Sequence, residues 1–163
     1  ILIIAPRHPI RSNEVLQISK KYITKSIIES KKYINSNTRC MICESLGEMP
    51  VYYSLSDIVI LGGSFVKMGG HNPIEPARYN CSIITGPSIF NWQNIFQEIS
   101  IKNSCLICNS PKELNEKVKL IFSKKMIEKK FKKKALQYSN QKQNIINDVI
   151  KNIKPYLKKI KYD

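Results

Sequence analysis

The chain has 163 residues and a mass of 18.8 kDa, the size of one ordinary domain with one hydrophobic core. Apolar residues make up 42% and charged residues 24%, a balance that excludes an intrinsically disordered chain. No stretch approaches the ~18 consecutive apolar residues of a membrane-spanning helix. The sequence has no initiating Met and no signal peptide, so we expect a part of a longer polypeptide whose N-terminal partner domain is absent.

The formal net charge of +15 is concentrated toward the C-terminus. Residues 111–163 carry 16 basic and 5 acidic side chains, whereas residues 1–110 contribute only +4 to the net charge. A basic end of this kind suits nucleic acid, an anionic lipid surface or an acidic substrate. Because lysine, isoleucine and asparagine are abundant throughout, we interpret most of these lysines as a compositional bias of the genome.

The predicted elements alternate between short apolar strands and helices with an apolar face. A strand over residues 1–5 precedes a helix over 12–31, which has Ser12 as N-cap and Val15, Ile18, Tyr22 and Ile23 as its apolar stripe. Next come a strand over 39–43, a helix over 48–55, a strand over 57–61, a helix over 73–79, a strand over 82–85, a helix over 91–101 and a strand over 104–108. After the N-cap Ser110, helices separated by polar turns continue through residue 154 and end at Pro155.

This order predicts an α/β fold, a Rossmann-like doubly wound parallel sheet of about five strands. We expect a single domain over residues 1–163, with basic helices over residues 124–163 at its end. In such sheets, ligands bind at the carboxyl ends of the strands. We therefore expect the polar segments that follow the predicted strands to converge on a binding site.

The five cysteines form two CxxC pairs, Cys40/Cys43 and Cys105/Cys108, and one single residue, Cys81. Two such pairs can indicate zinc. Each pair lies in a short apolar run, and positions i and i+3 of a strand face opposite sides of a sheet, so the two thiols of a pair could not bind one metal together. We predict buried free thiols and no metal site, which fits a reducing cytoplasm.

Two polar segments follow the first two predicted strands. Pro6-Arg7-His8-Pro9 places a guanidinium next to an imidazole, and an arginine there can bind phosphate or carboxylate oxygens, although a surface turn explains the same residues. Ser45-Leu46-Gly47-Glu48 contains a turn glycine and a glutamate. Glu48 either complements a helix dipole or accepts hydrogen bonds from ribose hydroxyls or a base amino group.

The third segment is the most specific, and it follows the predicted strand over residues 57–61. It contains Gly62-Gly63-Ser64-Phe65 and then Gly69-Gly70-His71-Asn72-Pro73-Ile74-Glu75-Pro76-Ala77. Small residues let backbone N–H groups approach an anion, and the helix near Pro73 would point its positive end to the same place. A turn with a helix cap explains the glycines and Asn72 separately, but it does not explain His71, Asn72 and Glu75 together.

Several enzyme classes lack their motif in this sequence. There is no Gly-Lys-Ser/Thr P-loop, and no GxGxxG follows a strand, which argues against a nicotinamide cofactor. No His/Asp/Glu cluster has metal-ligand spacing. Ser64 has no nucleophile-elbow context, so hydrolase chemistry is unsupported.

The three segments, in this order, resemble the C-terminal half of the 3-deoxy-D-manno-octulosonic acid (Kdo) transferases, and Gly86-Pro87 also fits. The resemblance runs from residue 1 to about residue 123. It implies the C-terminal half of a GT-B glycosyltransferase, in which two Rossmann-like domains face each other across a cleft and the C-terminal one holds the donor CMP-Kdo. It further implies inverting transfer of Kdo to lipid IVA in lipopolysaccharide (lipid A–core) biosynthesis, without a metal or other cofactor, at the cytoplasmic face of the inner membrane.

The resemblance also implies which residues contact the CMP moiety: Pro6, Arg7, Leu46, Gly47, Glu48, Asn72, Pro73, Ile74 and Glu75. We assign Arg7 to the charge of the donor and Glu75 to its ribose. Gly63 and Ser64 would shape the loop near the phosphate, and His8 and His71 would orient groups rather than react. The family's catalytic base is a glutamate of the N-terminal domain, which also contacts the lipid IVA acceptor. We therefore expect no catalytic residue in this chain and no sugar transfer by it alone.

Two alternatives stay open at this stage. One is the donor domain of another GT-B glycosyltransferase that uses a UDP-sugar. The other is a basic nucleic-acid-binding module, which the charge of residues 111–163 supports. The chain lacks the aromatic-basic interleaving of a recognised module, so we expect no nucleic-acid partner. Basic helices near an anionic inner-membrane surface are compatible with the main interpretation.

Overall fold

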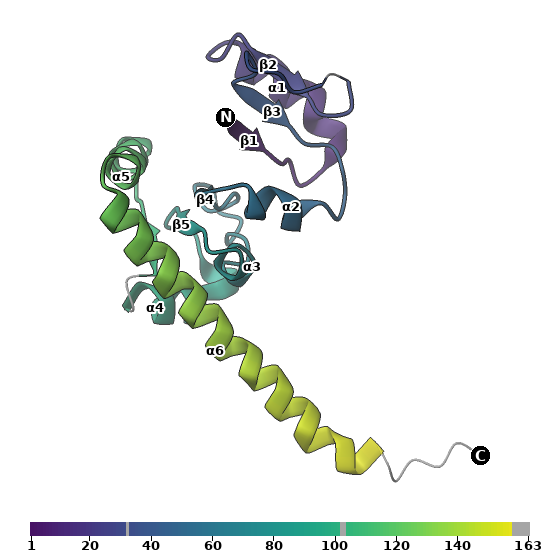
Figure 1. The fold of residues 1–163 in the computed structure, drawn as a ribbon, viewed down its shortest axis with the longest axis vertical. Helices are drawn as coiled ribbons and strands as arrows, with labels where there is room; N and C mark the ends of the chain where they lie inside the picture. The colour runs from purple at the N-terminus through teal and green to yellow at the C-terminus, as the bar shows by residue number, and fades with distance from the viewer. Residues whose placement is uncertain (32, 102–103, 158–163) are drawn as a thin grey trace, which may run out of the picture. The chain divides into compact units, whose positions relative to one another are not determined.

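The computed structural model describes residues 1–31, 33–101 and 104–157 (Figure 1). It comprises two compact units, an N-terminal unit of Ile1–Tyr52 and a C-terminal unit of Tyr53–Asp163. Each unit contains a parallel sheet of three strands, so the strands form two sheets rather than the one that the sequence pattern predicted. The α/β class is confirmed, and each of the five predicted strands is found at its predicted place. The single domain over residues 1–163 stays a prediction.

The N-terminal unit has the strand order β1-β3-β2, with β1 at Leu2–Ile4, β2 at Ser26–Ile28 and β3 at Cys40–Ile42. The central strand β3 is buried over its whole length, as expected of a parallel strand covered on both faces. A 3-10 helix, η1 (Pro9–Arg11), leads into α1 (Ser12–Lys20). The helix α2 (Met49–Ser54) begins in this unit.

Two small clusters pack on opposite faces of β3. Cys40 and Ile42 face α1 and contact its Val15 and Leu16. Met41 and Cys43 pack on the other face, together with Tyr52. The two thiols of this CxxC pair therefore lie on opposite faces, as predicted.

The predicted helix over residues 12–31 is wrong in its second half. The helix α1 ends at Lys20, and residues 26–28 form the strand β2, because the β-branched residues Ile23, Thr24, Ile27 and Ile28 favour an extended chain. Of the predicted apolar stripe, Val15 and Ile23 pack inward, whereas Ile18 and Tyr22 are exposed.

The prediction for the start of this helix is wrong as well. Arg11 occupies the N-cap position, and it makes no side-chain capping bond. Ser12 lies inside the first turn, where its buried hydroxyl has no hydrogen-bond partner among the residues described.

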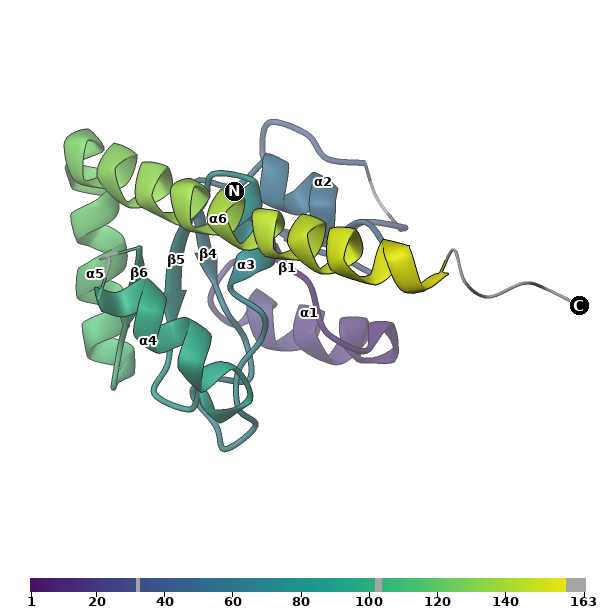
Figure 2. The same ribbon diagram turned by 90° about the horizontal axis from the view of Figure 1, so that it is seen from below.

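The C-terminal unit has the strand order β4-β5-β6, with β4 at Ile58–Ile60, β5 at Ser82–Thr85 and β6 at Cys105–Ile107. Its helices are α3 (Ile74–Arg78), the 3-10 helix η2 (Phe90–Trp92), α4 (Gln93–Ile101), α5 (Pro111–Ser123) and α6 (Lys125–Leu157). The helix α6 packs against α3, α5 and β5 (Figure 2). Ser110 caps α5 as predicted, since its hydroxyl accepts the N–H of Glu113 at 3.2 Å.

The core of the C-terminal unit also consists of two clusters. The larger cluster joins Ile83 of β5 to Phe96 and Ile99 of α4 and to Ala135 and Tyr138 of α6, and it includes Cys105. The smaller cluster joins Ile84 and Cys108 to Ile121 of α5. All five cysteines are buried and free, and no cluster of three or more metal-ligating side chains occurs in the part of the chain that the structure describes.

The helix α6 is one continuous helix of 33 residues, which corrects the prediction of several helices separated by polar turns. Its polar residues, such as Gln137 and Asn140, lie on the exposed face, where a helix accommodates them. Pro155 lies within the helix rather than ending it. Within residues 1–31, 33–101 and 104–157, no helix is both long and apolar enough to span a membrane.

Candidate functional site

Arg7 and His8 follow β1 in the N-terminal unit after Ala5 and Pro6, beyond the carboxyl end of that strand. Both side chains are exposed, and among the described residues neither of them forms a hydrogen bond or an ion pair. The Arg11 side chain, four residues later, instead forms an ion pair with Glu14, with its Nε 3.0 Å from Glu14 Oε2. The Arg7 guanidinium is therefore free to bind an anion, and Arg11 provides an occupied arginine for comparison.

The segment Leu46-Gly47-Glu48 follows β3, the direct neighbour of β1, so it leaves the same edge of the N-terminal sheet as Arg7. The two strand ends are joined by the hydrogen bond from Cys43 N–H to the Ile4 carbonyl, at 2.8 Å. Leu46, Gly47 and Glu48 are all exposed, and Gly47 has a φ of +84°. This arrangement agrees with the predicted convergence of these two segments.

A hydrogen-bonded group that the sequence analysis missed holds this loop at both ends. The Glu29 carboxylate, which follows β2, accepts the Tyr52 hydroxyl at 2.7 Å and the Ser45 hydroxyl at 3.2 Å. Ser45 precedes residues 46–48 and Tyr52 follows them. Burial and the bond to Glu29 raise the pKa of Tyr52, so its hydroxyl remains a donor near neutral pH. These contacts span 16 and 23 residues, and no local sequence signal indicates them.

Ser64 lies at the centre of the glycine-rich segment in the C-terminal unit and is fully buried. Its hydroxyl donates to the Leu61 carbonyl at 2.6 Å and accepts the Gly86 N–H at 2.8 Å, so it joins the end of β4 to the end of β5. The Ser64 carbonyl accepts the Ser88 N–H at 2.9 Å. A Cβ atom at position 86 would collide with that carbonyl oxygen, which explains the glycine there.

Two residues that the sequence analysis missed, Ser88 and Asn91, complete this loop. The Ser88 hydroxyl accepts the Gly69 N–H at 3.1 Å, and the Asn91 side-chain amide donates to the Met68 carbonyl at 3.0 Å. Gly69 has a φ of +81°, and a Cβ atom on it would collide with the Asn91 side chain. We call residues 62–72, held in this way, the glycine loop.

Asn72 joins the glycine loop to α3. Its Oδ1 accepts the Ile74 N–H at 2.9 Å, and its Nδ2 donates to Glu75 Oε1 at 3.3 Å. The N-cap of α3 is Pro73 rather than the predicted Asn72, which lies one residue earlier. The Asn72 side chain nevertheless binds the first N–H of the helix and orients the exposed Glu75 carboxylate. The His71 ring lies over Gly63, 3.8 Å from the position that a Cβ atom would take there.

The helix α3 has only five residues, so its dipole is weaker than the sequence analysis assumed. Its first N–H is already occupied by Asn72. Pro73 is fully buried, and Ile74 packs against the larger core cluster. Of the residues predicted in this segment, Asn72, Glu75 and His71 thus present the polar side chains.

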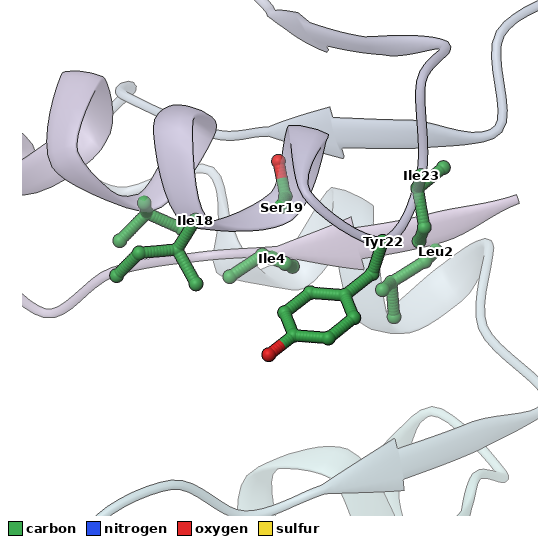
Figure 3. A pocket seen from close by; sticks show the side chains of 7 residues that line it. Leu2, Ile4, Ile18, Ser19, Tyr22 and Ile23 are labelled. Atoms are coloured by element: carbon green, nitrogen blue, oxygen red, sulfur yellow. The ribbon is translucent and has the colours of Figure 1, made fainter.

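An apolar hollow lies beside α1 and β1 in the N-terminal unit (Figure 3). It has a volume of about 370 Å³ and is lined by Leu2, Ile4, Val15, Ile18, Ser19, Tyr22 and Ile23. These lining residues include no charged side chain, and the Ser19 hydroxyl is occupied by the Leu16 carbonyl at 2.9 Å. The hollow is therefore unsuited to a phosphate, and none of its lining residues is among those predicted to contact CMP.

The chain is 32% identical over 161 residues, 98% of its length, to the 3-deoxy-D-manno-octulosonic acid transferase of Haemophilus influenzae. It is 30% identical over 159 residues, 96% of its length, to the transferase of the same name in Rickettsia typhi. These matches cover 38% and 34% of the two relatives, so the chain spans about a third of the length of the curated relatives it matches. No family model matches the chain.

A solved structure shows the same fold. The crystal structure of the C-terminal CMP-Kdo binding domain of WaaA from Acinetobacter baumannii superposes with a TM-score of 0.78 and 28% sequence identity. The match covers 83% of this chain and 72% of that chain. The resemblance that the sequence motifs indicated is confirmed: the chain is a homologue of the Kdo transferases and has the fold of the C-terminal GT-B domain of WaaA.

Proposed function

We propose that this chain is the donor-binding domain of a Kdo transferase and that it binds CMP-Kdo. The similarity to named Kdo transferases and to a CMP-Kdo binding domain supports this proposal. The observation that carries it is the glycine loop, which is built around the buried Ser64 at the carboxyl end of a parallel strand. Sheets of this class bind their ligands at that end.

In the N-terminal unit, Arg7 is the proposed donor-binding residue with a charged side chain suited to an anion. CMP-Kdo carries negative charge on its phosphodiester and on the sugar carboxylate. The exposed Arg7 guanidinium, which pairs with none of the described residues, suits either. Leu46, Gly47 and Glu48 would contact CMP from the adjacent loop. His8 would orient the bound group.

In the C-terminal unit, the oriented Glu75 carboxylate suits the ribose hydroxyls. Asn72, Pro73 and Ile74 would contact CMP from the start of α3. Gly63 and Ser64 would shape the loop near the phosphate, and His71, whose ring lies over Gly63, would orient the bound group.

For the whole protein we propose inverting transfer of Kdo from CMP-Kdo to lipid IVA in lipopolysaccharide biosynthesis. A hydroxyl of lipid IVA attacks the anomeric carbon, the bond from that carbon to the phosphate oxygen breaks, and CMP leaves. The base that takes the hydroxyl proton would come from the part of the relatives beyond the match to this chain. We further propose that the reaction needs no metal, because the Arg7 guanidinium would neutralise negative charge on CMP. We also propose that the reaction takes place at the cytoplasmic face of the inner membrane.

Isothermal titration of the chain with CMP tests donor binding. We expect weak binding that Arg7→Ala and Glu75→Ala each reduce by about tenfold, the size of a lost charge-assisted or ribose hydrogen bond. Arg11→Ala and Glu116→Ala are matched controls, because they remove an exposed arginine and an exposed glutamate outside the proposed site. Absence of CMP heat, or equal losses in the control variants, would contradict the proposal.

Three further measurements separate the remaining alternatives. Stronger binding of UDP than of CMP in a competition titration would favour a UDP-sugar donor domain. A loss of CMP binding in EDTA would contradict the metal-free site. Kdo transfer by the chain alone would contradict the expectation that the catalytic base lies outside it.

A further inference from the structure

The corner between α5 and α6 exposes two large apolar side chains. Figures 1 and 2 both show the two helices meeting there. Phe122, next to the last residue of α5, is 66% exposed, and Met126, the second residue of α6, is 86% exposed. The two side chains therefore flank the corner from either helix. We call residues 119–134 the corner segment.

The corner segment is also strongly basic. It contains a single acidic residue, Glu128, and eight lysines, at positions 119, 124, 125, 129, 130, 132, 133 and 134. Lys132 is bound to Asp57 and to Glu128, the latter at 2.6 Å. Within the part of the chain that the structure describes, the other lysines of the segment form no ion pair. Glu116, one turn before Lys119, is the nearest further acid on α5.

The fold leaves this surface free to bind a partner. The inward face of α6 is already used, because Ala135 and Tyr138 are buried in the larger core cluster. Met126, Lys129, Lys130 and Lys133 recur at helical spacing on the exposed face of α6. The apolar and the basic side chains can thus act together without any change in the packing of the unit.

We propose that the corner segment docks on an anionic lipid bilayer, with Phe122 and Met126 inserted at the headgroup boundary and the lysines at the lipid phosphates. Aromatic and thioether side chains are stabilised when they move from water to that boundary, and lysines close to an anionic surface add electrostatic attraction. A nucleic acid would complement the lysines, but its phosphate backbone offers no apolar layer for Phe122 and Met126. The paired apolar and basic groups therefore favour the bilayer.

This inference deepens the proposed function, since an enzyme with a lipid acceptor works at a membrane face, and it rests on that function only for the biological source of the lipid. The geometry of the corner segment does not involve the proposed donor-binding residues. The lipid proposal and the donor-binding proposal can therefore fail independently.

Flotation of the chain with vesicles tests the inference. We expect binding to phosphatidylcholine vesicles that contain phosphatidylglycerol, little binding to phosphatidylcholine alone, and a decrease with added salt. The double variant Phe122→Ser/Met126→Ser should lose about tenfold in vesicle affinity. The matched control Tyr22→Ser/Leu55→Ser changes side chains that are 84% and 70% exposed outside the corner segment, and it should bind like the unmodified chain.

A second pair of variants tests the lysines. Changing Lys124, Lys125, Lys129 and Lys130 to Gln should lower vesicle affinity about a hundredfold. The control changes Lys20, Lys21, Lys112 and Lys151 to Gln, which removes the same net charge from other places and should have a much smaller effect. Because all these side chains are exposed or half-exposed, circular dichroism should show unchanged folding in every variant.

Three outcomes would overturn the inference. The first two are equal losses of vesicle affinity in a corner variant and its control, and equal binding to both kinds of vesicle. The third is binding to single-stranded DNA that needs the lysines, while the substitutions at Phe122 and Met126 change the affinity for neither DNA nor vesicles. A CMP titration of the same samples separates the two proposals. Vesicle binding without CMP heat would support the corner segment and contradict donor binding, and CMP heat without vesicle binding would do the reverse.

Discussion

The glycine loop of the C-terminal unit and residues 5–8 of the N-terminal unit, which we call the Arg7 loop, both follow a parallel strand, yet they are held in different ways. The glycine loop is hydrogen-bonded along its length, through Ser64, Ser88 and Asn91. The Arg7 loop is fixed mainly where it enters η1, by the bond from Arg11 N–H to the His8 carbonyl at 3.0 Å. The Arg7 side chain itself is unrestrained by the described residues.

This difference indicates a division of tasks between the two units. A loop that is already rigid loses little conformational freedom when a ligand binds, so the glycine loop can provide a fixed shape at low entropic cost. A long exposed arginine adapts its position and provides charge. Substitutions in the glycine loop should therefore lower both stability and donor affinity, whereas Arg7→Ala should lower affinity alone.

The core of each unit matches this division. The C-terminal unit buries the large side chains Phe96 and Tyr138 between its sheet and its helices. The clusters of the N-terminal unit are smaller, with Ile28, Ile42 and Tyr52 as their main members. Ile18 of α1 and Tyr22, which follows α1, remain exposed. The more rigid loop thus belongs to the unit with the larger core.

The sharpest test of this comparison is the substitution Gly86→Ala. The added Cβ would collide with the backbone carbonyl of Ser64, which cannot move without breaking the loop. We expect a loss of about 3 kcal/mol in the free energy of unfolding, together with a clear loss of CMP affinity. Urea unfolding and isothermal titration measure the two effects.

Gly47→Ala is the matched control in the N-terminal unit. Gly47 has a φ of +84°, but a Cβ there would meet no described atom within 4 Å. The expected cost is the conformational one, about 1 to 2 kcal/mol. Equal losses of unfolding free energy in Gly86→Ala and Gly47→Ala would show that the close contact at Gly86 has no effect of its own. That result would contradict the distinction between a packed loop and an open one.

Ser64→Ala should have the next largest effect. It removes the buried hydroxyl that links the Leu61 carbonyl to the Gly86 N–H, and it leaves both groups without that partner. We expect a loss of about 2 kcal/mol in unfolding free energy. Ser45→Ala removes an exposed hydroxyl from its bond to Glu29 in the N-terminal unit and should cost less than about 0.5 kcal/mol. A loss of unfolding free energy in Ser64→Ala as small as that in Ser45→Ala would contradict the proposed role of the Ser64 hydroxyl.

The sequence could predict what is encoded locally. Each apolar run became a strand, the strand over residues 82–85 was predicted with its observed ends, and Ser110 caps α5 because it precedes Pro111 and Glu113. The spacing of Cys40 and Cys43 was enough to place their thiols on opposite faces of β3. These features depend on neighbours a few residues away, so they can be read without the fold.

The features that could not be predicted depend on residues far apart in the sequence. Ser64 accepts a hydrogen bond from a residue 22 positions later, and Asn91 donates to one 23 positions earlier. The strand β2 was missed because Tyr22 and Ile23 continue the helical period of α1. The β-branched residues over 23–28 favour an extended chain, and the pairing with β3 completes the strand. The common binding of one donor by Arg7, Glu48 and Glu75 stays a prediction that the titrations must test.

A smaller effect than those at Gly86 and Ser64 concerns a property that the two units share, their buried thiols. Burial raises the pKa of Cys43 and of Cys81 from the ordinary value of 9.0 to about 11 in each case. The folded chain therefore holds these protons more tightly than the unfolded chain, so their contribution to stability is complete below pH 9 and is lost as the pH rises toward 11. At pH 10 each thiol should account for a loss of about 1 kcal/mol in the free energy of unfolding.

Urea unfolding at pH 7 and pH 10 measures this loss. Cys43→Ala and Cys81→Ala should each reduce the difference in unfolding free energy between the two pH values by a similar amount. A reduction in only one variant would show that the units differ in the burial of their thiols as well as in the support of their loops.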